Sequence, residues 1–206
     1  MSNELNTNAL GGGISLLERR RAMMGVYKPY DAEVEYLQGS GTQYLDTGLY
    51  GNLDTKEEVS VNLSSLSCFV CGVRASNDNG ITMFATSNGT QRFGNKSITQ
   101  SWSANTNLLI SINKDYFIYN GNSAILNTTT SFTTSDTIHL MWAGYQAQTT
   151  AIMKGKLYYA KIWSGGTLIF DGIPVRVGTT GYMYDKVSGQ LFGNAGTGDF
   201  ILGNDI

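Results

Sequence analysis

The sequence has little charge, two cysteines, two prolines and one histidine, and these shortages argue against several classes of protein. Its 14 Lys and Arg against 16 Asp and Glu give a formal net charge of −2, whereas nucleic-acid binding depends on clustered cations. The cysteines are too few for a disulfide framework. No apolar run approaches the roughly 18 residues that a membrane span needs. We therefore expect no nucleic-acid partner and no membrane insertion.

Glycine is abundant instead, with 25 residues that often separate short runs rich in β-branched and aromatic residues. Such runs predict strands of an antiparallel meander near the C-terminus. They are Leu157–Trp163, Leu168–Ile173, Tyr182–Tyr184, Gln190–Phe192 and Phe200–Leu202. Gly165-Gly166 predicts a hairpin turn, because glycine adopts positive φ at no steric cost. Pro174, which lacks an N–H, is expected at the end of its strand.

Further strands are predicted upstream by alternating or continuous apolar patterns. They are Asp31–Gln38, Lys56–Leu63, Cys68–Val73, Ile81–Ala85, Leu108–Ile112, Tyr116–Tyr119 and Thr137–Trp142. Asn120-Gly121 is the strongest short hairpin signal. The segment Thr86–Thr106 is polar, with Phe93, Ile98 and Trp102 as its only large apolar residues. About a dozen strands in two stacked antiparallel sheets account for this pattern.

Two stretches also carry a family resemblance. The run KIW…GTLIFDGIPVR…GYMYDKVSGQLFGNAGTGDFILG and the segment VEYLQGSGTQYLDTG (Val34 to Gly48) resemble concanavalin A-like (LamG-like) jelly-roll modules. More narrowly, they are similar to the modules in phage and prophage surface proteins of gut Bacteroidetes. The resemblance covers about residues 31–204 and implies an all-β, two-sheet antiparallel sandwich whose first and last strands are neighbours. This fold hosts lectins, hydrolases and interaction modules alike, so function has to be argued from a site.

An N-terminal arm (residues 1–30) is expected to precede the sandwich (residues 31–206). Ile14–Met24 has a helical apolar stripe, and Gly25 follows as a natural stop. A helix this short has only marginal stability in water on its own, so we expect its apolar stripe to be buried against another surface. Either it packs back on its own sandwich, or it docks on another subunit or a larger assembly. The predicted attachment residues are Leu16, Leu17, Arg19, Arg20, Arg21, Met23 and Met24.

Glycan binding needs aromatic platforms for sugar faces and amide groups for hydroxyls. Trp102 lies in a polar stretch where no core pattern includes it, and Tyr145 has a similar setting. With Gln100 and Asn105 they form the predicted glycan-binding set. Both aromatic residues could equally cap the end of the sandwich.

Candidates for catalysis and metal binding are few. Glu33 and Glu35 lie two apart on the polar face of the first predicted strand, where solvated charge is the expected use, so no catalytic residue is predicted. His139 lies on the face opposite Ile138 and Leu140, without a sequence neighbour placed as a nucleophile. The turn containing Asp78 and Asn79 is a weak calcium candidate, because any tight turn uses the same residues. Otherwise no cofactor is expected.

The two thiols and the function complete the predictions. Cys68 and Cys71 are expected as buried, unpaired thiols. The resemblance implies a phage virion protein, a head or tail fibre or decoration protein, that presents its sandwich to host glycans for adhesion. The order of charge and apolar residues near the N-terminus is not that of a secretory signal. This order fits assembly in the host cytoplasm and display on the virion, with homo-oligomers (dimer or trimer) and other virion proteins as partners. The alternatives are a polysaccharide-acting enzyme or a bacterial surface lectin.

Overall fold

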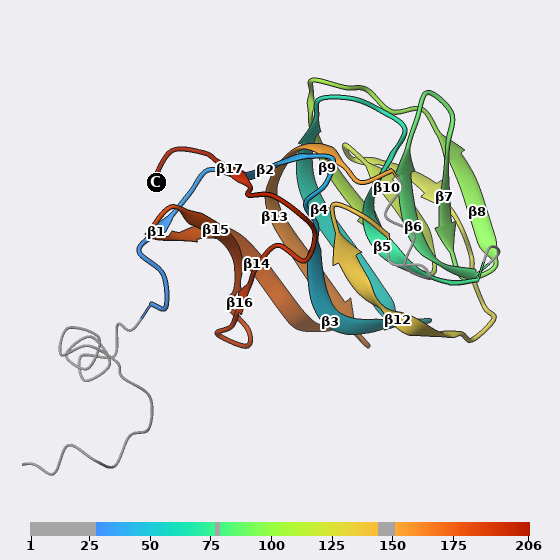
Figure 1. Cartoon of the computed structure of the whole chain (residues 1–206). Helices are drawn as coiled ribbons and strands as arrows, with labels where there is room; N and C mark the ends of the chain where they lie inside the picture. Colours follow the sequence, from blue (N-terminus) through green and yellow to red (C-terminus); the bar gives the residue numbers. More distant parts are fainter. Residues whose placement is uncertain (1–27, 77–78, 144–150) are drawn as a thin grey trace, which may run out of the picture.

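The computed structural model describes residues 28–76, 79–143 and 151–206 as a two-layer β-sandwich of jelly-roll type (Figure 1). Every regular element in these ranges is a strand, and the two sheets are antiparallel throughout. This confirms the predicted fold class. These ranges contain no helix long and apolar enough to cross a membrane.

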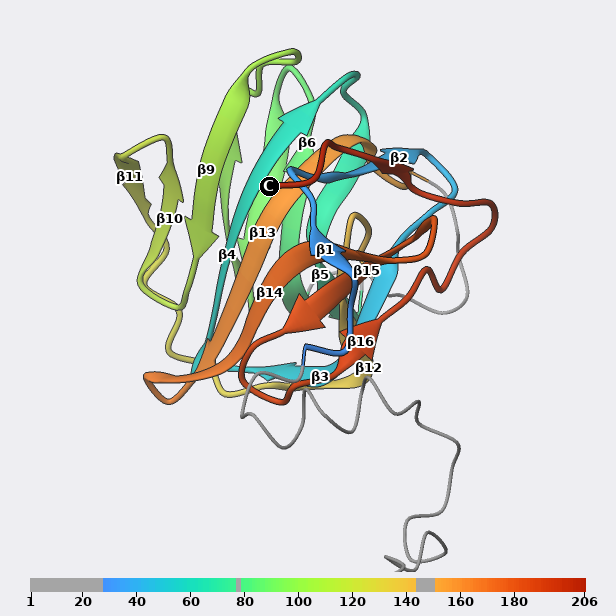
Figure 2. The same ribbon diagram turned by 90° about the vertical axis from the view of Figure 1, so that its left-hand side faces the viewer.

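The larger layer, called the large sheet, has 11 strands in the order β11-β10-β9-β4-β13-β14-β15-β16, with β1, β2 and β17 attached beside it. Their bounds are β1 Ala32–Glu33, β2 Leu37–Ser40, β4 Thr55–Leu63, β9 Asn107–Ile112, β10 Tyr116–Tyr119, β11 Asn122–Ile125, β13 Lys154–Ser164, β14 Thr167–Val177, β15 Thr180–Asp185, β16 Leu191–Phe192 and β17 Ile201–Leu202. Figure 2 shows this sheet in front of the second layer.

The second layer, called the small sheet, has six strands in the order β3-β12-β5-β6-β7-β8. Their bounds are β3 Leu45–Asn52, β5 Cys68–Ser76, β6 Asn79–Ala85, β7 Gly89–Phe93, β8 Lys96–Gln100 and β12 Thr133–Leu140. The predicted central position of the strand from Cys68 is confirmed, because β5 lies between β12 and β6. The β7–β8 hairpin was not predicted, since it falls within the polar segment Thr86–Thr106.

The core lies between the sheets and follows from the alternation of side chains along each strand. In β4 every second residue, including Val59, Val61 and Leu63, is buried. Leu157, Ala160 and Ile162 of β13 are buried on the same side, and the small sheet adds apolar residues from the opposite layer. The turn predictions are also confirmed, because Asn120-Gly121 and Gly165-Gly166 have positive φ at hairpin turns.

Two details of the predicted strands are wrong. Asp31–Gln38 is not one strand, because β1 ends at Glu33, and β2 begins at Leu37 beside β13. Pro174 lies inside β14 rather than at its end. It lies beyond Gly172, where the pairing of β14 with β13 stops, and its carbonyl accepts the Val34 N–H at 3.0 Å. The missing N–H of Pro174 therefore interrupts no bond to β13.

The first and last strands are neighbours, as predicted. β17 pairs with β2, and Val34 bridges to Asp205. Residues 1–27, with the whole predicted attachment set, lie outside the described residues, so the boundary near residue 30 and the helix remain predictions.

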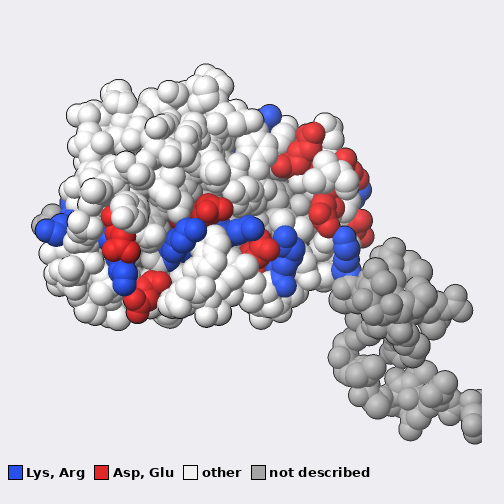
Figure 3. Space-filling view, turned by 180° about the vertical axis from the view of Figure 1, so that it is seen from behind, with Lys and Arg blue, Asp and Glu red and all other residues white. Residues whose placement is uncertain are grey.

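Charge on the sandwich is largely paired. On the outer face of the large sheet, Lys56 lies 3.5 Å from Glu58, while Lys161 and Lys186 lie 3.8 and 3.1 Å from the carboxylate of Asp171. Figure 3 shows Lys and Arg interspersed with Asp and Glu along one band of the rear face. No single sign of charge dominates that face.

Candidate functional site

A hollow of about 360 Å³, called the Trp163 hollow, lies where three turns meet at one end of the large sheet. Its lining is Leu53, Asp54, Thr55, Lys56, Asn113, Lys114, Asp115, Trp163, Gly165 and Gly166. The positive φ values of Gly165 and Gly166 produce the tight β13–β14 turn, and a Cβ at either position would meet nothing within 4 Å. The turn therefore leaves open space beside the ring of Trp163.

Trp163 faces outward because its neighbour Ile162 is buried in the core, and successive strand residues alternate. The ammonium of Lys56, its partner in the register with β4, lies 4.1 Å from the ring centroid. This cation–π contact holds the indole in place at the edge of the hollow.

Polar groups surround the ring from the other two turns. Lys114 Nζ lies 3.8 Å from Asp54 Oδ1, and Asp115 adds a second carboxylate. The Asn113 side-chain oxygen accepts the N–H groups of Asp115 and Tyr116, both at 2.8 Å, which fixes the β9–β10 turn. An aromatic ring beside carboxylates and ammonium groups is the combination that binds a saccharide through its apolar face and its hydroxyls.

The structure places Trp102 elsewhere than predicted for a glycan platform. Its side chain is 5% exposed and packs against Phe117 and Tyr119, with ring centroids 6.3 and 5.4 Å away. Trp102 lies on the crossover from β8 to β9, and its backbone N–H donates to the Thr86 carbonyl oxygen at 3.1 Å, while its indole N–H has no partner among the described residues. Trp102 therefore caps the sandwich, the alternative use that its sequence context left open.

The other predicted glycan residues do not form one site. Gln100 ends β8 and donates from Nε2 to Ser101 O at 2.7 Å. Asn105 is exposed and lines a different hollow, of about 250 Å³, with Asn62 and Lys156 among its neighbours. Tyr145 lies outside the described residues.

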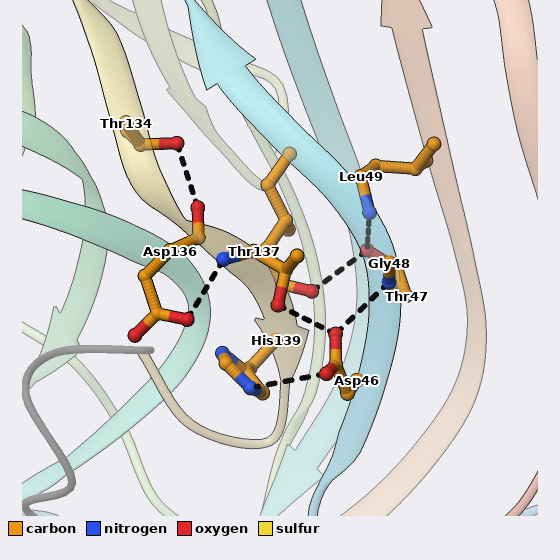
Figure 4. Close-up of polar contacts among 9 residues, drawn as sticks. Asp46, Thr47, Gly48, Leu49, Thr134, Asp136, Thr137 and His139 are labelled. Atoms are coloured by element: carbon orange, nitrogen blue, oxygen red, sulfur yellow. Dashed lines mark hydrogen bonds and ion pairs between the residues drawn. The ribbon is translucent and has the colours of Figure 1, made fainter.

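His139 lies on β12, the second strand of the small sheet, where it pairs with Asp46 of the edge strand β3 (Figure 4). Burial lowers the pKa of its imidazole, although Asp46 and Asp136 act in the opposite direction. Its Nε2 is 4.0 Å from Asp46 Oδ2, and its ring packs against Tyr44 and Trp142. The same Asp46 carboxylate accepts from Thr137 Oγ1 at 2.6 Å and from Gly48 N at 2.9 Å. This network joins β3 to β12.

Glu57 is a buried carboxyl group that the sequence analysis did not single out. It is fully buried between the sheets, and burial raises its pKa to about 8. The Cys71 thiol, from the opposite sheet, donates to Oε2 at 3.1 Å, while Oε1 has no partner among the described residues. Burial also raises the pKa of the Cys71 thiol, and both cysteines are buried and unpaired, as predicted. The alternating pattern of β4 could have predicted this burial, because Glu57 lies two residues before Val59 and therefore faces the same side of the sheet.

Glu33 and Glu35 are not a pair on one strand, since the chain bends between β1 and β2. Hydrogen bonds from Lys28 and Tyr30, both 2.8 Å, lower the pKa of the Glu33 carboxyl, and Glu35 accepts from Asn204. The lowered pKa favours the ionised form of the Glu33 carboxyl.

For metal binding, no three His, Cys, Asp or Glu side chains converge among the residues that the structure describes. Of the weak calcium candidates, Asp78 lies outside that part of the chain. Asn79 begins β6, and its Oδ1 is buried with no hydrogen-bond partner among the described residues.

The sequence matches no protein-family model and no curated protein. One similar solved structure is a candidate carbohydrate-binding protein from Bacteroides ovatus ATCC 8483, with a TM-score of 0.50 and 9% sequence identity. The match covers 84% of this chain and 60% of that protein, so the chain spans less than two thirds of its length. At this identity the likeness establishes the fold alone.

Proposed function

We propose that this chain is a glycan-binding β-sandwich and that the Trp163 hollow contacts the saccharide. The observation that carries the proposal is one hollow of about 360 Å³ that combines an indole ring with Asp54, Asp115, Lys56 and Lys114. This volume falls within the range of roughly 300–1,000 Å³ that is usual for small-molecule sites. The carbohydrate-binding role suggested for the similar Bacteroides protein supports the same class of ligand.

Binding to an array of neutral oligosaccharides, followed by calorimetry on the best binder, tests this proposal. Trp163→Ala should weaken the affinity about tenfold or more, because the sugar loses its stacking platform. Tyr50→Ala is the matched control, since it removes an exposed ring from β3 in the other sheet. Equal affinity in wild type and Trp163→Ala would show that the hollow is not the site.

The same samples separate binding from turnover. We expect the bound oligosaccharide to be recovered intact, so the protein acts by adhesion rather than as an enzyme. Release of new reducing ends by the wild type, lost in Asp54→Asn, would identify a hydrolase instead.

We further propose that the sandwich is displayed on a virion surface through residues 1–30. The sequence resemblance of residues 31–204 to phage modules supports this, together with the predicted helix at Ile14–Met24. Removing residues 1–27 should leave the strands intact, because the first strand begins at Ala32. Sedimentation should then show loss of self-association with an unchanged melting temperature. Retained self-association with a much lower melting temperature would place the helix on its own sandwich.

A further inference from the structure

A second hollow of about 250 Å³, called the amide hollow, lies at the opposite end of β4 and β13 from the Trp163 hollow. Its lining is Gln38, Asn62, Ser64, Asn105, Gly155 and Lys156. Asn62 faces outward, because Val61 and Leu63 on either side of it are buried in the core. Lys156 is its direct partner on β13, so both side chains project from the outer face of the large sheet.

The amide hollow presents groups suited to sugar hydroxyls. Asn105, one of the residues predicted for glycan binding, is held at this end of β4 because its backbone N–H donates to Leu63 O at 2.7 Å. The Asn62 side chain is oriented by its own bond, since Nδ2 donates to Asn107 Oδ1 at 2.8 Å. A carboxamide both donates and accepts hydrogen bonds, as a sugar hydroxyl does. The amide groups of this hollow can therefore bind a saccharide unit through its hydroxyls.

An outward-facing stripe of residues on β4 and β13, called the outer stripe, connects the two hollows (Figure 2). Between the hollows lie the pairs Lys161–Glu58 and Tyr159–Ser60. Aromatic rings continue to the amide hollow, where Tyr158 and Tyr36 have ring centroids 6.0 Å apart and Lys156 Nζ lies 4.0 Å from the Tyr36 centroid. From Lys56 to Asn62 a strand advances about 20 Å. One sugar ring cannot reach both hollows, but an extended chain of several sugars can.

Charges along the outer stripe are balanced. Lys56 lies 3.5 Å from Glu58, and Lys161 lies 3.8 Å from Asp171 on β14. The two carboxylates of the Trp163 hollow would also repel an anionic chain at that end. The outer stripe therefore suits an uncharged polysaccharide better than a polyanion.

We propose that the outer stripe binds a neutral, linear polysaccharide along its length, with one sugar unit in each hollow and further units over the tyrosines between them. This inference rests on the proposed glycan-binding function, and it adds that the ligand is an extended chain rather than a single terminal sugar. Once one unit is bound, the others are held at a high local concentration, so contacts along the chain reinforce each other. Affinity should therefore rise with chain length until both hollows are filled.

Calorimetry on the full chain with cello-, xylo-, manno- and laminari-oligosaccharides, from disaccharide to octasaccharide, tests the inference. In the series that binds, the octasaccharide should bind at least about tenfold more tightly than the disaccharide. Asn62→Ala should weaken the octasaccharide about tenfold and change the disaccharide little, because the disaccharide binds at the Trp163 hollow. Trp163→Ala should weaken every length.

Asn95→Ala is the matched control, since it removes an exposed asparagine of the small sheet whose Nδ2 also donates to a side-chain oxygen, Thr130 Oγ1. It should bind every length like the wild type. Melting temperatures verify that each variant is folded.

The possible failures are distinguishable. Equal affinities for disaccharide and octasaccharide, with both lowered by Trp163→Ala, would overturn the extended-chain inference and leave the proposed function standing. An octasaccharide that binds folded Asn62→Ala as tightly as the wild type would do the same. Tighter binding of oligogalacturonate, a chain of carboxylates, would contradict the neutral ligand. If no oligosaccharide of any length binds, both the inference and the proposed function fail.

Discussion

Trp102 and Trp163 occupy opposite sequence contexts and opposite places in the molecule. Trp102 sits among serines and is buried at the end of the core, whereas Trp163 ends an apolar run and faces the solvent side of β13. Glu57 and Glu58 repeat the contrast: they are sequence neighbours, yet one lies between the sheets and the other pairs with Lys56 outside. Whether these side chains are buried depends on which face of the strand they occupy and on where a connecting segment crosses the core. The polarity of their sequence neighbours does not predict it.

Truncating the two tryptophans gives the largest expected difference. Trp102→Ala should lower the free energy of unfolding by about 3–5 kcal/mol, because it leaves a cavity against Phe117 and Tyr119. Trp163→Ala should cost about 1 kcal/mol or less, since its ring lies on the surface. Urea denaturation measures both. Similar losses for the two variants would contradict the assignment of one ring to the core and one to a site.

The buried carboxyl group of Glu57 should make stability depend on pH. The pKa of Glu57 is raised by burial from an ordinary value of 4.5 to about 8, so only the unfolded chain ionises this group between these values. The contribution of Glu57 to the free energy of unfolding is therefore fully present below pH 4.5, and it is lost as pH rises toward 8. By linkage, the wild type should lose on the order of 3 kcal/mol relative to Glu57→Gln between pH 4.5 and pH 7.

Comparison with the Gln variants separates this effect from that of His139. Because the pKa of His139 is lowered in the folded state, protonation of His139 destabilises the fold as pH falls below 6.5, which is the opposite direction of pH. Glu58→Gln serves as the matched control, because it removes the neighbouring carboxyl group from the outer face of the same strand. Parallel profiles for wild type and Glu57→Gln would show that Glu57 is ionised in the folded state.

The contact between Lys56 and Trp163 should give the smallest effect. Lys56→Met should destabilise the fold by about 0.5–1 kcal/mol, because the ammonium leaves the ring face. In the Trp163→Ala background the same substitution should cost less, so a double-mutant cycle isolates the pair. Additive losses would mean that Lys56 acts through Glu58 alone.

The sequence predicted the fold class and most strands because apolar alternation is strong in β4, β5 and β13. It missed the β7–β8 hairpin because a polar side chain substitutes for an apolar one there. Gln91 is fully buried, and its amide bonds to both Phe84 N and Phe84 O, at 3.0 and 2.9 Å. No periodicity of hydrophobic residues reveals such an exchange.

The candidate site was harder to predict than the fold. Trp163 follows Ile162 in an apolar run, so it looked like core, and the groups around it come from turns more than 40 residues apart in the sequence. The predicted attachment segment lies outside the described residues and stays a prediction.

The pairing of the first and last strands determines how the sandwich responds to a pulling force. Tyr36 accepts from Gly203, Glu35 donates to Asn204, and Ile206 donates to Glu33, so the two ends run side by side in opposite directions (Figure 1). Tension between residue 31 and residue 206 would open these bonds one after another, as in a zipper, instead of loading them together. If the protein is tethered only at its N-terminal side, the force does not act between these two ends. In an adhesion module held in that way, β17 would therefore stay paired with β2 when the module is pulled.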